Sequence, residues 1–175
     1  APANISRLES NGLYSKVLTL CTDDNSAKSL CIRGDYLYHG RKGIPADRVR
    51  GQELYKKALA KILPAAEAGD MDAQYWAARC LEYGVHDLKA WFSVKRLGAV
   101  GASFDEAREA ALRYAKAASE AGNADGTALM AWLAYIDCRG ERNFEKALPE
   151  IRKSVEGNSP LGKMLLGRMY MEGAA

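Results

Sequence analysis

The chain has 175 residues, of which 48% are hydrophobic and 27% are charged, a composition typical of folded globular domains rather than disordered chains. Its 25 basic and 22 acidic residues are interspersed and leave a net charge of only +3, so the charge gives no indication of nucleic-acid binding. The longest apolar run, residues 128–136, is far shorter than the ~20 residues that cross a bilayer, and we expect no membrane span.

The first 24 residues indicate an N-terminal capping region with a helical stretch at 13–20. Cys21 lies near the end of that stretch and Cys31 lies early in the next expected helix. Across a hairpin that turns at Asn25, the two thiols would lie at similar heights. We therefore expect a Cys21–Cys31 disulfide, worth ~2–3 kcal/mol in the chain-entropy model, with two buried thiols as the alternative.

A small-residue pattern then recurs four times along the chain. The fourth and ninth residues after each start are small in all four copies, and the fifteenth is glycine in three of them. Small side chains at these positions let a second helix approach closely, and a glycine can end the helix. The four starts are Asn25, Gly69, Gly122 and Asn158.

A second amphipathic helix is expected after each of the first three copies. Ser103 is a candidate N-cap for one of them, with Glu106 three residues later. Pro64 and Pro149 fall inside these patterns and predict a kink or a shorter helix. The expected second helices are 52–68, 104–121 and 144–156.

The segments at 65–69 and 118–122, Ala-Ala-Glu-Ala-Gly and Ala-Ser-Glu-Ala-Gly, resemble the motif that ends Sel1-like repeats, relatives of the tetratricopeptide repeat. The resemblance implies an all-α fold, a right-handed α-solenoid of about three and a half helical hairpins over residues 25–175. The chain departs from the family pattern at Asp137, which replaces the glycine of the third copy, and through an insertion at about 85–102.

Residues with catalytic or ligand-binding patterns are scarce. His39 and His86 stand without other ligands at metal-binding spacing, and no phosphate-binding or nucleophile motif occurs. Residues 23–25 resemble the start of a calcium loop but lack its glycine and glutamate, so we expect an interhelix turn capped by Asn or Ser. We expect no catalytic, cofactor or metal site, and therefore no enzyme.

The resemblance also indicates where a partner protein would bind. In tetratricopeptide-like solenoids, partners contact the residues of each first helix that face away from its hairpin mate. Tyrosine, tryptophan and arginine at such positions are enriched in binding hot spots, although Trp132 and Tyr135 could equally pack between repeats. The residues at these positions are Asp35, Tyr38, His39, Tyr75, Arg79, Glu82, Tyr83, Trp132, Tyr135 and Arg168. Within the insertion, we expect one of Trp91 and Phe92 to pack on the core and the other to face the partner.

By resemblance, the chain is a non-enzymatic module that binds another protein. The most specific expectation is an immunity protein that neutralises an antibacterial effector of type VI secretion, such as a phospholipase. The alternatives are a scaffold in envelope assembly or signalling, and an enzyme that binds or hydrolyses β-lactams. Bacterial relatives are often exported, and the chain begins Ala1-Pro2-Ala3 without methionine. We therefore expect that a targeting peptide or another leading sequence was removed, and we expect a periplasmic location, with the cytoplasm as the alternative.

Overall fold

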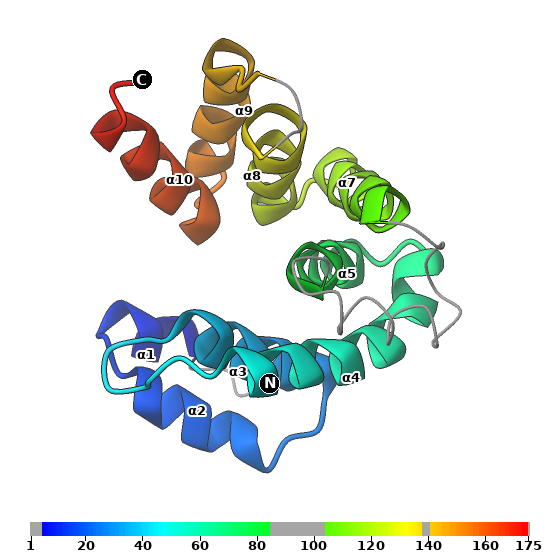
Figure 1. Ribbon diagram of the computed structural model, residues 1–175, viewed down its shortest axis with the longest axis vertical. Coiled ribbons are helices and arrows are strands. Elements are labelled where there is room, and N and C mark those ends of the chain that lie inside the picture. Colours follow the sequence, from blue (N-terminus) through cyan, green and yellow to red (C-terminus); the bar gives the residue numbers. More distant parts are fainter. Residues whose placement is uncertain (1–4, 85–103, 138–140, 175) are drawn as a thin grey trace. The chain divides into compact units, whose positions relative to one another are not determined.

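The computed structural model describes residues 5–84, 104–137 and 141–174 (Figure 1). These residues form α-helices and one π-helical segment, and no strand occurs among them apart from an isolated bridge between Arg41 and Ile44. The predicted all-α class is therefore confirmed. The elements are α1 (Ile5–Ser10), α2 (Tyr14–Thr22), α3 (Ala27–His39), α4 (Arg48–Glu67), α5 (Met71–Gly84), α7 (Phe104–Glu120), α8 (Ala124–Ala131), η1 (Trp132–Ile136), α9 (Phe144–Glu156) and α10 (Pro160–Met171).

The second helices lie close to their predicted ranges, and α9 matches its range at both ends. Of the two outcomes predicted for proline, a kink or a shorter helix, the shorter helix is wrong, because Pro64 lies inside α4 and Pro149 lies inside α9. Both prolines are exposed. The carbonyl group that each leaves without an N–H partner can therefore bond to water, which lowers the cost of the proline.

The chain forms two compact units. Unit 1 comprises Ala1–Ile62 and Cys80–Ala107, and unit 2 comprises Leu63–Arg79 and Arg108–Ala175. In unit 1, α2 contacts both α1 and α3. In unit 2, each of α8, α9 and α10 packs against the other two around a core that includes Ile151 (Figure 1).

The four predicted copies begin with the same local structure. Helices α3, α5, α8 and α10 each start two residues after the predicted copy start. In each case the side chain of the intervening residue accepts a hydrogen bond from the backbone N–H three residues later, which is the N-cap that an exposed helix end requires. The four acceptors are Ser26 Oγ, Asp70 Oδ1, Asn123 Oδ1 and Ser159 Oγ, at 3.3, 2.7, 2.8 and 2.8 Å from the donor nitrogens.

The turn before three of these N-caps is also the same. Gly69, Gly122 and Asn158 have φ values of +93°, +94° and +62°. In each turn this residue donates its N–H to the carbonyl three residues earlier, and the next residue donates to the carbonyl five residues before itself. This is the Schellman arrangement, which ends one helix immediately before the next begins. The recurrence in the sequence therefore encodes a helix–turn–helix connection.

A hydrogen bond that the sequence did not reveal links successive copies within unit 2. The Asn123 side chain donates to Asp72 Oδ1 over 2.9 Å, and the Ser159 hydroxyl donates to Asp125 Oδ1. Both aspartates are the third residue after the start of their copy, and both donors are the N-cap residue of the following copy. Asp125 also accepts the backbone N–H of Leu161 at 3.3 Å.

The small residues of the pattern permit close packing of helices at some of these positions, but not at every one. A Cβ added at Gly126 would lie 2.7 Å from the Cβ of Ala118 in α7, and one added at Gly34 would lie 3.2 Å from the carbonyl oxygen of Gly51 in α4. The expectation fails at Gly167, which is exposed, with no atom within 4 Å of the corresponding Cβ position.

We therefore predict opposite effects for two glycine-to-alanine changes in helices of unit 2. Gly126→Ala should lower the free energy of unfolding by about 1–3 kcal/mol, because the methyl group overlaps Ala118. Gly167→Ala should raise it by about 0.5–1 kcal/mol, because alanine favours the helix and the site is open. Urea unfolding followed by circular dichroism measures both, and equal effects would contradict the packing described here.

The turn at residues 23–25 is built as expected for an interhelix turn, with Ser26 as the N-cap of α3. Asp24 supports this turn, because its carboxylate accepts the Ser29 hydroxyl at 2.6 Å and the Ser26 N–H at 2.7 Å. These hydrogen bonds lower the pKa of Asp24 from 3.8 to about 2, with the bond from Ser29 as the largest cause.

Because its pKa is lower in the folded state, ionised Asp24 should stabilise the fold above pH 4. We predict that this contribution is lost as the pH falls through about 2, when the folded carboxylate takes up a proton. NMR titration of the Asp24 carboxyl carbon measures the pKa directly. Asp24→Asn should remove this part of the acid dependence of unfolding, and a carboxyl that titrates at pH 4 would contradict the prediction.

Candidate functional site

Four aromatic side chains of unit 1 pack together; we call Tyr38, His39, Tyr55 and Tyr83 the aromatic cluster. The ring centroids of Tyr38 and Tyr83 are 5.0 Å apart, and those of His39 and Tyr83 are 4.7 Å apart in an edge-to-face arrangement. Tyr55 is 1% exposed and stacks on Tyr83 with an interplanar angle of 16° and a centroid distance of 5.4 Å. Helices α3, α4 and α5 thus each supply at least one ring, and such ring pairs stabilise the packing beyond their buried area.

Asp35 contacts two members of the cluster, Tyr55 and His39. Its carboxylate accepts the Arg41 guanidinium at 2.5 Å and the Tyr55 hydroxyl at 3.3 Å, and lies 3.8 Å from His39 Nε2. The Asp35 side chain is only 15% exposed. Asp35 therefore orients the surrounding side chains, and its charge is offset by Arg41.

The solvent edge of the cluster carries positive charge. The Arg48 guanidinium lies 5.8 Å from the centroid of Tyr38, within the range of a cation–π interaction. Arg48 and His39 are exposed, whereas Tyr38 and Tyr83 are half-buried. The arrangement presents fixed aromatic edges beside a cation, which suits contact with a protein surface.

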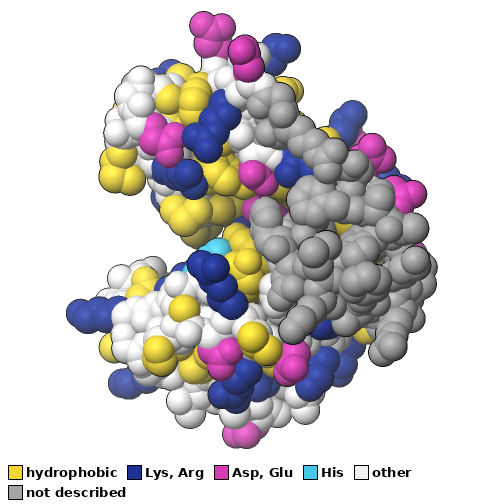
Figure 2. Space-filling model, viewed as in Figure 1, with side chains coloured by type: hydrophobic (Ala, Val, Ile, Leu, Met, Phe, Trp, Pro, Cys, Tyr) yellow, Lys and Arg dark blue, Asp and Glu magenta, His cyan; other side chains and the backbone are white. Residues whose placement is uncertain are grey.

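A second group of predicted partner residues meets in unit 2. The Arg168 guanidinium lies 4.9 Å from the centroid of Trp132, and its Nε donates to Glu172 at 2.8 Å. Trp132 and Tyr135 are partly buried against the core of α8, α9 and α10, which is the packing alternative for these aromatics. Figure 2 shows hydrophobic side chains on the surface over α10, where Met164, Tyr170 and Met171 are 61%, 55% and 84% exposed.

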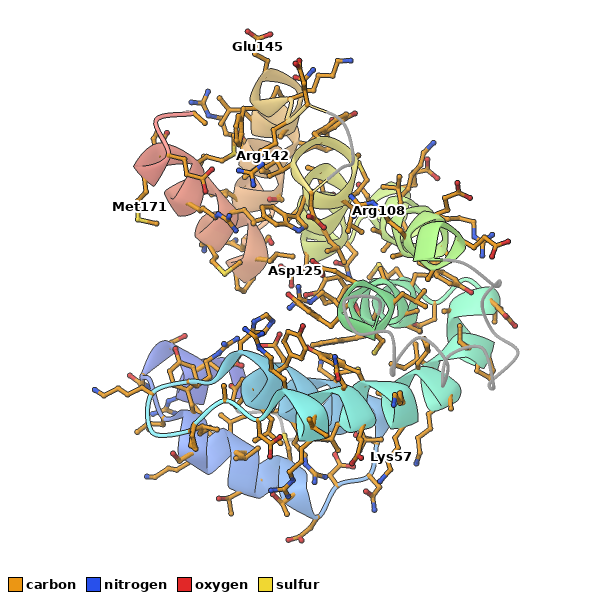
Figure 3. The ribbon with its side chains drawn as sticks, in the orientation of Figure 1. Lys57, Arg108, Asp125, Arg142, Glu145 and Met171 are labelled. Carbon is orange, nitrogen blue, oxygen red and sulfur yellow. The ribbon has the colours of Figure 1, made fainter. Side chains whose placement is uncertain are left out.

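Trp132 and Tyr135 lie on η1, and Arg108 of α7 supports that segment (Figure 3). Arg108 donates from Nη2 to the carbonyl of Leu133 at 3.1 Å and from Nη1 to Asp137 Oδ2 at 3.2 Å. The Asp137 N–H reaches back to the Trp132 carbonyl at 2.7 Å, a five-residue π-type bond. The third copy therefore ends through a π-turn held by Arg108 instead of through a glycine.

The other predicted partner residues that the structure describes are Tyr75, Arg79 and Glu82. Tyr75 packs edge-to-face on Trp76, with centroids 5.1 Å apart. Arg79 and Glu82 are buried, at 9% and 8% exposure, so we remove both from the candidate partner surface. The expectations for Trp91 and Phe92 lie outside the described residues.

The predicted Cys21–Cys31 disulfide is not formed in this structure. Cys21, Cys31 and Cys80 are all buried thiols. The sulfur of Cys31 lies 3.5 Å from the sulfur of Cys80, on α5, because α3 packs along α5 within unit 1. The pairing predicted from the sequence considered only the neighbouring hairpin and missed this contact.

Neither Tyr55 nor Arg108 was predicted as part of a site. Tyr55 belongs to a stripe with Ala58, Leu59 and Ile62 at helical spacing, all buried, so periodicity alone could have placed it in the core. The role of Arg108 depends on a carbonyl group 25 residues away, for which the sequence carries no signal.

Within the described parts of the chain, no group of three His, Cys, Asp or Glu side chains is placed to hold a metal ion, and no helix is long and apolar enough to cross a membrane. Comparisons with protein-family models, with curated proteins and with solved structures give no match for this chain. The Sel1-like assignment therefore stays a prediction from the sequence.

We predict that Arg108→Ala lowers the free energy of unfolding by about 1–2 kcal/mol, because the buried Leu133 carbonyl loses its charged donor. The matched control on the same helix is Lys116→Ala, whose side chain is 67% exposed and makes only a surface ion pair; it should change the free energy by less than about 0.5 kcal/mol. Thermal unfolding monitored through Trp fluorescence measures both, and similar losses for the two variants would argue against the role of Arg108.

Proposed function

We propose that this chain is a non-enzymatic protein-binding module whose partner protein docks on the solvent edge of the aromatic cluster. One observation supports this most directly. Tyr38, His39 and Tyr83, which were expected to face a partner, come from two different copies of the repeat and pack together. Tyrosine rings held by their neighbours give large contact areas at little entropic cost, as in known hot spots.

The charges around the cluster favour a partner with an acidic surface. Arg48 is exposed over Tyr38, and the carboxylate of Asp35, which contacts the cluster, is already paired with Arg41. Arg48 therefore adds positive charge beside the exposed rings. Complementary charge would speed the encounter and discriminate against partners that lack it.

We also propose the more specific form of this function. The repeated turn and the resemblance to Sel1-like repeats support a right-handed α-solenoid, a class that commonly binds partners. In this proposal the chain is a periplasmic immunity protein, and its partner is an antibacterial effector of type VI secretion such as a phospholipase. The chain would inhibit the effector by binding it, without chemistry of its own.

The test is affinity purification with the tagged chain from envelope extracts of the native organism, followed by identification of the retained protein. We expect a secreted hydrolase that this chain inhibits at a one-to-one ratio. Against that purified hydrolase, Tyr83→Ala should weaken binding at least about thirtyfold, or ~2 kcal/mol, because a hot-spot ring is lost.

Two further variants make the result specific. His39→Ala removes a side chain that is more exposed than that of Tyr83, so it should also weaken binding, with a smaller loss of packing than Tyr83→Ala. Tyr170→Ala, on the exposed face of α10, is the matched tyrosine control and should leave the affinity unchanged. Retention of only assembly or signalling components would contradict the immunity role, and full affinity in both cluster variants would contradict the docking site.

A further inference from the structure

We infer that Cys31 and Cys80 are a dithiol–disulfide pair, a modification site that can join α3 to α5 covalently within unit 1. The two sulfur atoms lie 3.5 Å apart. Both side chains are almost completely buried, at 0% and 2% exposure. This inference is independent of the proposed partner.

The geometry favours a bond between these two sulfurs. A disulfide has a sulfur–sulfur distance of about 2.05 Å, so the atoms need to approach by about 1.5 Å, which small side-chain rotations can supply. The same two helices meet again at Tyr38 and Tyr83, seven and three residues further along, with ring centroids 5.0 Å apart. The two helices therefore contact each other at two places in the same order along both helices, and these contacts keep the Cys31 and Cys80 thiols facing each other.

Cys21, the third described cysteine, is a weaker candidate. Its thiol forms a hydrogen bond with the Ser29 side chain. The nearest sulfur to Cys31 for which the structure gives a contact is that of Cys80. The oxidised form should therefore contain the long-range bond rather than the predicted Cys21–Cys31 bond.

The oxidant that the inference requires is a low-molecular-weight disulfide, such as oxidised glutathione. One cysteine thiolate attacks a sulfur of this reagent, which forms a mixed disulfide and releases one thiolate of the reagent. The second cysteine, after losing its proton, attacks the protein sulfur of the mixed disulfide and releases the other reagent thiolate. The protein thiols lose two electrons in total, the reagent gains them, and the two released thiolates take up the two protons.

The bond would constrain a long segment of the unfolded chain. The two cysteines are 49 positions apart, and the loop between them contains all of α4. In the chain-entropy model, closing a loop of this size raises the ratio of folded to unfolded molecules by about a thousandfold. The burial of both thiols indicates that oxidation occurs mainly while the protein folds or opens locally.

The test is to refold the reduced chain in a buffer of reduced and oxidised glutathione, alkylate the remaining thiols, and map the cysteines by mass spectrometry without reduction. We expect two of the four cysteines to be alkylated and one peptide to join Cys31 to Cys80. The urea midpoint of this oxidised form should exceed that of the reduced form.

Two alanine variants serve as matched controls, because a buried thiol behaves as a small apolar side chain. Cys21→Ala should keep both the bond and the difference between the urea midpoints, and Cys80→Ala should lose both. If Cys80→Ala fails to fold, the peptide map of the unaltered chain decides alone. Four alkylated cysteines, or a bond between any other pair, would overturn the inference.

Discussion

The packing of the helices depends on how the backbone groups at their ends are satisfied. The last carbonyls of one helix and the first N–H groups of the next have no partners within their own helices. At Gly122 and Asn158, a left-handed residue turns two N–H groups back onto the preceding helix. The next side chain, on Asn123 or Ser159, then accepts an N–H of the following helix. Because the connection is so short, the two helices must lie against each other.

The close approach of neighbouring helices determines which side chains fit between them. At Gly126 the neighbouring backbone and the methyl group of Ala118 leave no room for a Cβ atom. In unit 1, a Cβ at Gly51 would lie 2.7 Å from the backbone nitrogen of Tyr38. The backbone of α4 therefore approaches that of α3 directly at a residue of the aromatic cluster. The rings of Tyr38 and Tyr55 meet because two backbones come close, and the candidate site therefore depends on glycines that are not themselves part of the aromatic cluster.

The sequence predicted the local features of this structure better than the long-range ones. The N-cap at Ser26 and the range of α9 follow from capping and periodicity, which operate over a few residues. Two of the contacts that define the candidate regions join residues far apart: Cys31 with Cys80, and Arg108 with Leu133. Their partners depend on which helices are neighbours in space, which local capping and periodicity do not reveal.

The hydrogen bonds of Asp125 have a consequence for local opening of the fold. Its carboxylate binds both the Ser159 hydroxyl and the Leu161 N–H, so the first turn of α10 is tied to the first turn of α8. The start of α10 cannot fray without leaving this half-buried carboxylate short of donors, which is unfavourable. Amide exchange at the two helix starts should therefore be coupled, and neighbouring copies in unit 2 open as a cooperative pair rather than one helix at a time.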